Sequence, residues 1–185
     1  MTVLLGDKDR FAAEVGEWDH ALCRVDLWAA GQWLTCDDNM VFVKQFRLAV
    51  LNTAAWLRSG QGSPPPFTGL SPTATHKRLM LRAGDDDETE AKYELRSRFQ
   101  TLSWGPTTDN VTAYLFREGD DLTITLQFWR EPPERAAEIF LAEIPVAEFV
   151  ETLEDLVRST CKTLGLGRPG DGRSGHPGVA GRRAD

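Results

Sequence analysis

Residues 111–164 constrain the fold of this 185-residue chain more than any other stretch, because their apolar side chains follow two different periods in succession. Alternation with a period of two puts successive side chains on opposite faces of a strand, whereas three- and four-residue steps form one stripe along a helix. Alternating runs cover 111–116 and 122–128, with the turn sequence Glu-Gly-Asp-Asp between them at 118–121. A third apolar run covers 139–144 and predicts a third strand.

The helical stripe that closes this stretch runs from Val146 to Leu164. Its apolar members are Val146, Phe149, Val150, Leu153, Leu156, Val157, Cys161 and Leu164. A sheet with one apolar face must bury that face, and this helix is the nearest element that can cover it. We therefore expect the hairpin, the third strand and the helix to pack together.

The N-terminal part of the chain has the same layout of strands followed by a helix. Residues 11–15 and 20–28 predict strands, and Ala29–Gln32 can close a hairpin onto a returning strand at 33–36. A second apolar stripe predicts a helix from about Asn39 to Ser59. Asp37, Asp38 and Asn39 are all suitable residues for capping its start.

The middle of the chain is less regular. A loop at 60–72 contains three consecutive prolines, and the charged run at 85–88 predicts a solvated turn. The sequence of residues 77–81 weakly favours a strand. Residues 92–104 predict a clear one, because Tyr93, Leu95 and Phe99 alternate with charged residues. Such alternation indicates an antiparallel sheet with one face in water.

Together these elements predict an α+β fold, in which a twisted, mostly antiparallel sheet of six to eight strands packs against two main helices. We expect residues 1–164 to form a single domain. Seven of the last 21 residues are glycine and few are large and apolar, so residues 165–185 predict a disordered Gly/Arg-rich tail.

Charge favours some partners over others. The formal net charge is −7, and the tail holds four arginines and two aspartates, which leaves −9 for residues 1–164. An acidic body repels phosphate backbones, so we do not expect nucleic-acid binding by the folded part. It favours a protein partner with a basic surface, although the same charge can serve solubility alone.

The hydropathy and the cysteines of the sequence both favour a cytoplasmic protein. No apolar run reaches the roughly 18 residues of a membrane span, and the N-terminus lacks the pattern of a signal peptide. The three cysteines form no Cys-x-x-Cys pair, as expected for free thiols in the cytoplasm. Cys36 is the best candidate nucleophile, because it precedes a predicted helix start. The alternative is a thiol buried as a small apolar side chain.

The sequence contains none of the common nucleotide-binding, hydrolase or metalloprotease motifs. His20, Cys23 and Cys36 could supply metal ligands, but strand alternation puts His20 and Cys23 on opposite faces. The Asp37-Asp38-Asn39 run is explained by helix capping. We therefore expect no cofactor, no metal and no catalytic residues.

Exposed aromatic residues suggest where binding would occur. Trp28 and Trp33 flank the first hairpin turn, and Trp129 follows the polar face of the 122–128 strand. Aromatic side chains on a polar sheet face often mark a binding surface, and the alternative is that both faces are covered. A small-molecule pocket between sheet and helix is a second possibility. The three tryptophans would line it, with Arg24, Asp26 and Arg98 as its polar groups.

The pattern from Asn110 to Thr160, with the Ala142–Phe149 segment turning from strand into helix, resembles small α+β immunity proteins of bacterial polymorphic-toxin systems. It is similar also to uncharacterised actinobacterial domains of that build. The resemblance implies a non-enzymatic cytoplasmic protein that binds a protein partner, of immunity or accessory type. A small enzyme or a ligand carrier is the alternative. Immunity families share no binding residues that could be transferred to this chain.

Overall fold

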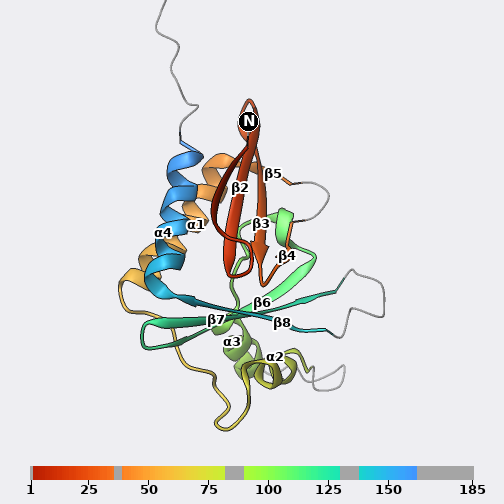
Figure 1. Cartoon of the computed structure of the whole chain (residues 1–185). Helices are drawn as coiled ribbons and strands as arrows, with labels where there is room; N and C mark the ends of the chain where they lie inside the picture. Colours follow the sequence, from red (N-terminus) through yellow and green to blue (C-terminus); the bar gives the residue numbers. More distant parts are fainter. Residues whose placement is uncertain (1, 36–38, 82–89, 130–137, 162–185) are drawn as a thin grey trace, which may run out of the picture.

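A computed structural model describes residues 2–35, 39–81, 90–129 and 138–161 of the chain (Figure 1). The N-terminal sheet comprises β1 (Val3–Asp7), β2 (Phe11–Asp19), β3 (Leu22–Ala29), β4 (Gln32–Trp33) and β5 (Met40–Phe42). The C-terminal sheet comprises β6 (Val111–Glu118), β7 (Asp121–Phe128) and β8 (Phe140–Pro145). The helices are α1 (Val43–Arg58), α2 (Pro72–Met80), α3 (Glu90–Phe99) and α4 (Val146–Ser159), with a short 3-10 turn, η1, at Pro106–Thr108.

The α+β class is confirmed, and the number of strands agrees with the prediction. The strands form two antiparallel sheets rather than the single sheet that we expected. In the first, the order is β1-β2-β3-β4, and β5 also pairs with β3; in the second, it is β6-β7-β8. All of α1, α2 and α3 lie between the two sheets in the sequence.

One apolar core joins the two sheets to α1 and α4. The two helices lie side by side, and their buried stripes meet the inner faces of both sheets (Figure 1). The Phe11 ring of β2 is 4.7 Å from that of Phe149 in α4 and 6.1 Å from that of Trp104, both edge to face. The predicted C-terminal helix is thus confirmed from Val146 onward, and residues 162–185, including the predicted tail, lie outside the described residues.

The predicted strand at 92–104 is wrong, because residues 90–99 form helix α3. Leu95 and Phe99 are four residues apart and therefore also lie on one helix face, whereas Tyr93 is exposed. The Glu, Ala, Lys, Leu and Arg residues of this segment are all strong helix formers.

The weak strand at 77–81 is also wrong, because residues 72–80 form helix α2. Ser71 caps this helix by accepting a hydrogen bond from the Ala74 backbone at 3.2 Å, and Pro72 occupies its first turn. The solvated turn predicted at 85–88 lies outside the described residues.

Helix α1 begins four residues later than predicted. Residues 40–42 extend the N-terminal sheet as β5, and the helix starts at Val43 with Phe42 at its cap position. The side chain of Asn39 does not cap the helix, because its amide donates to the Asp26 carboxylate at 2.7 Å. The buried Asp26 carboxylate on the neighbouring strand β3 thus binds the Asn39 side chain, which the sequence alone assigns to the helix cap.

The C-terminal sheet is covered on its inner face and, over β6 and β7, on its outer face as well. Its inner face meets the main core, and a second apolar cluster lies on its outer face, where Leu79 and Phe99 pack on Tyr114 and Phe116. His76 of α2 is also buried there, with its Nδ1 2.9 Å from the Thr125 hydroxyl. This cover reaches Tyr114 and Phe116 but not Trp129, which is 51% exposed after the end of β7.

Candidate binding surface and cleft

The N-terminal sheet has an inner face covered by helices and an outer face without a described helix over it, which we call the bare face, although Ala12 and Asp26 on that face are buried. Its inner residues are buried, whereas Glu14, Arg24, Asp26 and Trp28 alternate with them and point to the outer face. Helices α1 and α4 both lie on the other side, so among the described helices none packs over the outer face (Figure 1).

Asp26 organises this face. It is only 4% exposed, and its Oδ1 accepts hydrogen bonds from the Trp33 indole at 2.9 Å, the Thr35 hydroxyl at 3.1 Å and the Asn39 amide at 2.7 Å. Its Oδ2 pairs with the Arg24 guanidinium through Nε at 3.0 Å and Nη2 at 2.9 Å. Burial acts to raise the pKa of Asp26, but these hydrogen bonds outweigh it and hold the pKa below its ordinary value.

The network fixes two side chains that remain accessible to a partner. Trp33 is 41% exposed although its indole nitrogen is bound, and Arg24 is about half exposed although its guanidinium is held by two hydrogen bonds. Side chains ordered before binding lose less conformational entropy when a partner arrives. Trp and Arg are also enriched among the residues that dominate binding energy at protein interfaces.

Trp28 lies beside this network, directly across from Trp33 in the β3–β4 register. The Lys8 ammonium sits 3.9 Å from the centre of the Trp28 ring and 3.3 Å from the Glu14 carboxylate. The buried Trp28 indole nitrogen has no hydrogen-bond partner among the described residues.

The structure therefore brings together three of the five predicted site residues, Asp26, Trp28 and Trp33, along with Arg24. Arg98 and Trp129 lie elsewhere. Arg98 is in α3, and Trp129 follows β7 with its backbone amide bonded to the Asn110 carbonyl at 3.1 Å. The predicted pocket lined by the three tryptophans is not assembled, because Trp129 belongs to the C-terminal sheet.

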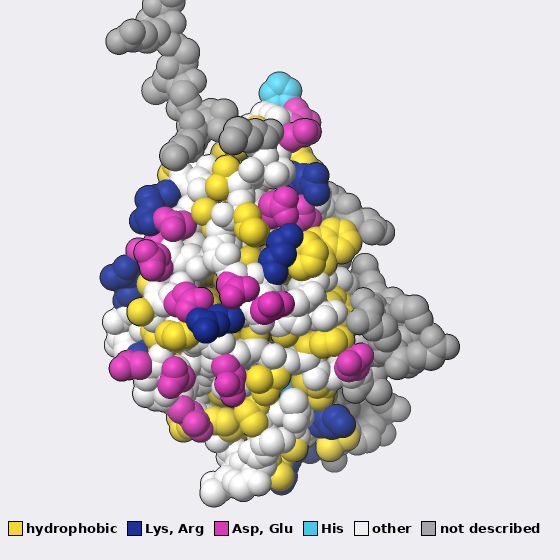
Figure 2. All heavy atoms as spheres, viewed as in Figure 1, with side chains coloured by type: hydrophobic (Ala, Val, Ile, Leu, Met, Phe, Trp, Pro, Cys, Tyr) yellow, Lys and Arg dark blue, Asp and Glu magenta, His cyan; other side chains and the backbone are white. Residues whose placement is uncertain are grey.

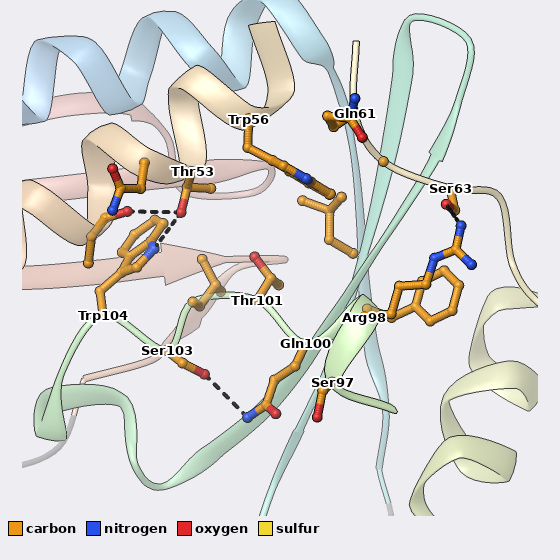
Figure 3. Close-up of a pocket in the computed structure, with 16 residues that line it drawn as sticks. Thr53, Trp56, Gln61, Ser63, Ser97, Arg98, Gln100, Thr101, Ser103 and Trp104 are labelled. Atoms are coloured by element: carbon orange, nitrogen blue, oxygen red, sulfur yellow. Dashed lines mark hydrogen bonds between the residues drawn. The ribbon is translucent and has the colours of Figure 1, made fainter. Parts of the chain in front are cut away.

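A cleft of about 630 Å³ lies between α1 and the segment that follows α3 (Figure 3). Trp56 of α1 faces it from one side, while Gln100, Thr101 and Ser103 face it from the other. Its wall is fixed by a hydrogen bond from the Trp104 indole to the Thr53 hydroxyl at 3.0 Å. At its rim, the Arg98 guanidinium donates to the Ser63 hydroxyl at 2.6 Å.

The floor of this cleft contains a residue in an unusual backbone conformation. Leu102 is buried with a φ of 60°, in the left-handed region that non-glycine residues seldom adopt. Of the described residues that line the cleft, Arg98 alone is ionisable. The cleft thus suits binding of a polar molecule better than acid–base chemistry. Sequence reasoning missed it because residues 92–104 were interpreted as one strand.

Acidic side chains gather next to the candidate surface. The acidic belt comprises Asp7, Asp9, Glu118, Asp120, Asp121, Glu143, Glu148 and Glu151, from the β1–β2 turn, the β6–β7 hairpin, β8 and α4. Arg10 pairs with Glu148 at 2.6 Å, and the Val146 amide donates to the Asp120 carbonyl at 2.8 Å, which ties these elements together. Figure 2 shows the Asp and Glu side chains gathered across the middle and lower left of this face.

Neither the described cysteines nor the described His, Asp and Glu side chains assemble into a reactive or metal-binding cluster. Burial raises the pKa of the Cys23 thiol to about 11, so this thiol is not ionised at neutral pH, and Cys161 is exposed at the end of α4. Cys36 and the neighbouring Asp37 and Asp38 lie outside the described residues. Within the described part of the chain, no three His, Cys, Asp or Glu residues converge as a metal site would require. None of the described helices has the length and apolar character needed to cross a membrane.

No protein-family model and no curated protein matches the sequence. The fold is similar to the crystal structure of CdiI from Burkholderia dolosa AUO158, with a TM-score of 0.53 over 85% of this chain and 99% of that one. The two sequences are 13% identical, so the likeness is one of fold. CdiI is an immunity protein of a contact-dependent inhibition toxin system. The expected resemblance to immunity proteins is therefore confirmed for the fold.

Proposed function

We propose that this protein is a non-enzymatic, cytoplasmic binding module of immunity type, whose partner is a toxin domain with a basic surface. The similarity in fold to CdiI supports an immunity role. The observation that carries the proposal is the bare outer face of the N-terminal sheet, where a buried Asp26 holds an exposed Trp33 and Arg24 in fixed positions. Burial of such pre-ordered side chains is how rigid interfaces gain affinity.

The acidic belt supports a basic partner. It adjoins the candidate surface through the β1–β2 turn, where Lys8 contacts Trp28 and is flanked by Asp7 and Asp9. Charges at the rim of an interface mainly raise the association rate and favour partners of opposite sign. We therefore assign the belt to attraction and orientation of the toxin, and the Trp33 region to tight binding.

The test is a pair of matched tryptophan variants, whose binding to the product of the neighbouring gene, taken as the candidate toxin, is measured. Trp33 and Trp56 are 41% and 40% exposed, but Trp33 lies on the outer sheet face and Trp56 lines the cleft. We expect Trp33→Ala to weaken binding by about 2 kcal/mol or more, which is roughly 30-fold in Kd. Trp56→Ala should change Kd by less than about twofold.

The opposite pattern, in which Trp56→Ala abolishes toxin binding and Trp33→Ala does not, would contradict this surface assignment. Stable folding of both variants is checked by their thermal unfolding. The charge of the belt is tested separately: doubling the ionic strength should slow association of the wild-type protein while changing dissociation little.

The cleft supports a second candidate function, the binding of a small polar molecule. Its volume of about 630 Å³ lies in the range of small-molecule sites, and its hydroxyl and amide side chains converge from two elements. A metabolite library screened by thermal unfolding tests this function. A compound that raises the unfolding temperature of the wild type, but not that of Arg98→Gln, would be bound in the cleft. Such a result would favour a ligand carrier over a purely protein-binding role.

A further inference from the structure

A second surface, which we name the α1 groove, lies between the β2–β3 turn and the first half of α1. It encloses about 540 Å³, and its lining residues are Trp18, His20, Ala21, Phe42, Val43, Lys44, Arg47, Leu48 and Leu51. The Val43 amide donates to the Ala21 carbonyl at 3.1 Å, so the turn and the start of the helix are held together. None of these residues belongs to the outer-face network around Asp26.

The groove is apolar where a surface helix is expected to be polar. Helix α1 already buries one stripe, of which Phe46 and Val50 are members, in the main core. Leu48 and Leu51 lie on a different side of the helix and are 60% and 41% exposed, and the neighbouring Phe42 is 51% exposed. A contiguous apolar surface of this kind marks an interaction site more often than an inert surface.

The charged side chains that line the groove share one sign. Lys44 and Arg47 follow the same three- and four-residue spacing as Leu48 and Leu51, so all four lie along one face of α1. The buried Nε of Arg47 has no hydrogen-bond partner among the described residues. A carboxylate that entered the groove would pair with the guanidinium of Arg47, which lines the groove.

This charge pattern argues against a second copy of the chain as the occupant. In a two-fold pair, each groove would face an identical groove, which supplies no carboxylate from its own lining for Lys44 and Arg47. Among the described residues that line the groove there is no carboxylate. An occupant with apolar side chains and at least one carboxylate fits both features at once.

We propose that the α1 groove binds an apolar, acidic segment of a protein partner, with Leu or Phe side chains against Leu48 and Leu51 and a carboxylate at Arg47. This surface is additional to the one proposed for the toxin. It would allow the protein to contact a second partner, or a second region of the same partner, while the outer sheet face is occupied.

The test uses the full chain and two synthetic helical peptides of about 14 residues with identical leucine spacing, one flanked by Glu and one by Lys. Backbone and methyl NMR shifts locate each peptide, and fluorescence anisotropy gives its Kd. We expect the Glu peptide to shift the resonances of Phe42, Leu48 and Leu51 and to bind about tenfold or more tightly than the Lys peptide. Arg47→Gln should remove most of that preference, and Leu48→Asp should abolish binding.

Leu141→Asp serves as the control, because Leu141 is an exposed leucine of β8, remote from the groove, and this variant should bind like the wild type. Equal binding of both peptides, shifts located outside the groove, or no binding of either at about 1 mM would overturn the proposal. Concentration-dependent dimerisation in sedimentation experiments that Leu48→Asp abolishes would also overturn it, because a second copy would then occupy the groove.

Discussion

The two sheets of this protein differ in what covers them. The C-terminal sheet packs against the main core on one face, and α2 and α3 cover the β6 and β7 part of its other face, whereas Leu141 and Glu143 of β8 are exposed. The N-terminal sheet is covered by helices on its inner face only, and its outer face carries a hydrogen-bonded polar network in which Asp26 is buried and Trp33 and Arg24 are exposed. Covering the outer face of the N-terminal sheet as well would bury more surface and add stability. Because no described helix covers it, this face is the better candidate for function.

The largest effect should come from the core that both sheets share. Phe149 is fully buried, and its ring packs edge to face on Phe11 of the N-terminal sheet. Replacing Phe149 with Ala leaves a cavity at this junction and should lower the free energy of unfolding by about 3–5 kcal/mol. Urea denaturation measures the change. A loss below about 1 kcal/mol would show that the two sheets do not depend on one core.

The buried His76 on the outer face of the C-terminal sheet should make the stability of the protein sensitive to acid. Burial of His76 against the sheet lowers its pKa to about 4, so the native protein holds a neutral imidazole where the unfolded chain binds a proton below about pH 6.5. Stability should therefore be complete above pH 6.5 and should fall by up to about 1.4 kcal/mol per pH unit between pH 6.5 and 4.

Denaturation series at several pH values, compared between the wild type and His76→Gln, would measure this dependence. The variant should lack the decline between pH 6.5 and 4, whatever its stability at neutral pH. An equal decline in both proteins would mean that α2 does not bury His76 against the sheet.

Asp26 on the bare face should make stability sensitive to acid at lower pH values than His76 does. The hydrogen bonds to Asp26 hold its pKa below the ordinary value, so its contribution to stability is present above the unfolded pKa of about 3.9 and is lost as the pH falls below it. At neutral pH, Asp26→Ala leaves the donors of Trp33, Thr35 and Asn39 without their acceptor and should cost about 2–3 kcal/mol. Asp26→Asn should cost less, because its carbonyl can still accept one or two of these bonds.

The smallest expected effect on stability is that of the exposed tryptophan itself. Trp33→Ala removes a side chain that is 41% exposed and donates one hydrogen bond to Asp26, so the free energy of unfolding should fall by only about 1 kcal/mol. The same substitution is expected to cause a large loss of toxin binding. A loss of stability comparable to that of Phe149→Ala would indicate that Trp33 serves the fold and not a partner.

Local periodicity predicted the elements that meet the core through one continuous stripe or face. The hairpin of β6 and β7, strand β8 and the start of α4 at Val146 all follow from apolar spacing, because each element buries one face against the same core. Helix α3 was missed because Leu95 and Phe99 fit both periods, and its charged residues could not distinguish a wet strand from an exposed helix.

The candidate surface was predictable only in part. The hairpin at Ala29–Gln32 places Trp28 across from Trp33, and strand alternation puts Asp26 on the same face. The bond between Asp26 and Asn39 was not foreseeable, because Asn39 at an expected helix start reads as a cap. Arg98 and Trp129 were grouped with this surface on residue type alone, and nothing in local sequence indicates that they belong to other parts of the fold.

Indole NMR signals test the central claim most directly. The chain has six tryptophans, and each gives one indole N–H signal that reports its own surroundings. On addition of the toxin domain, we predict that the signals of Trp28 and Trp33 move while those of Trp56 and Trp129 stay in place. If the Trp33 signal stays and the Trp56 or Trp129 signal moves, the outer face of the N-terminal sheet is not the binding surface.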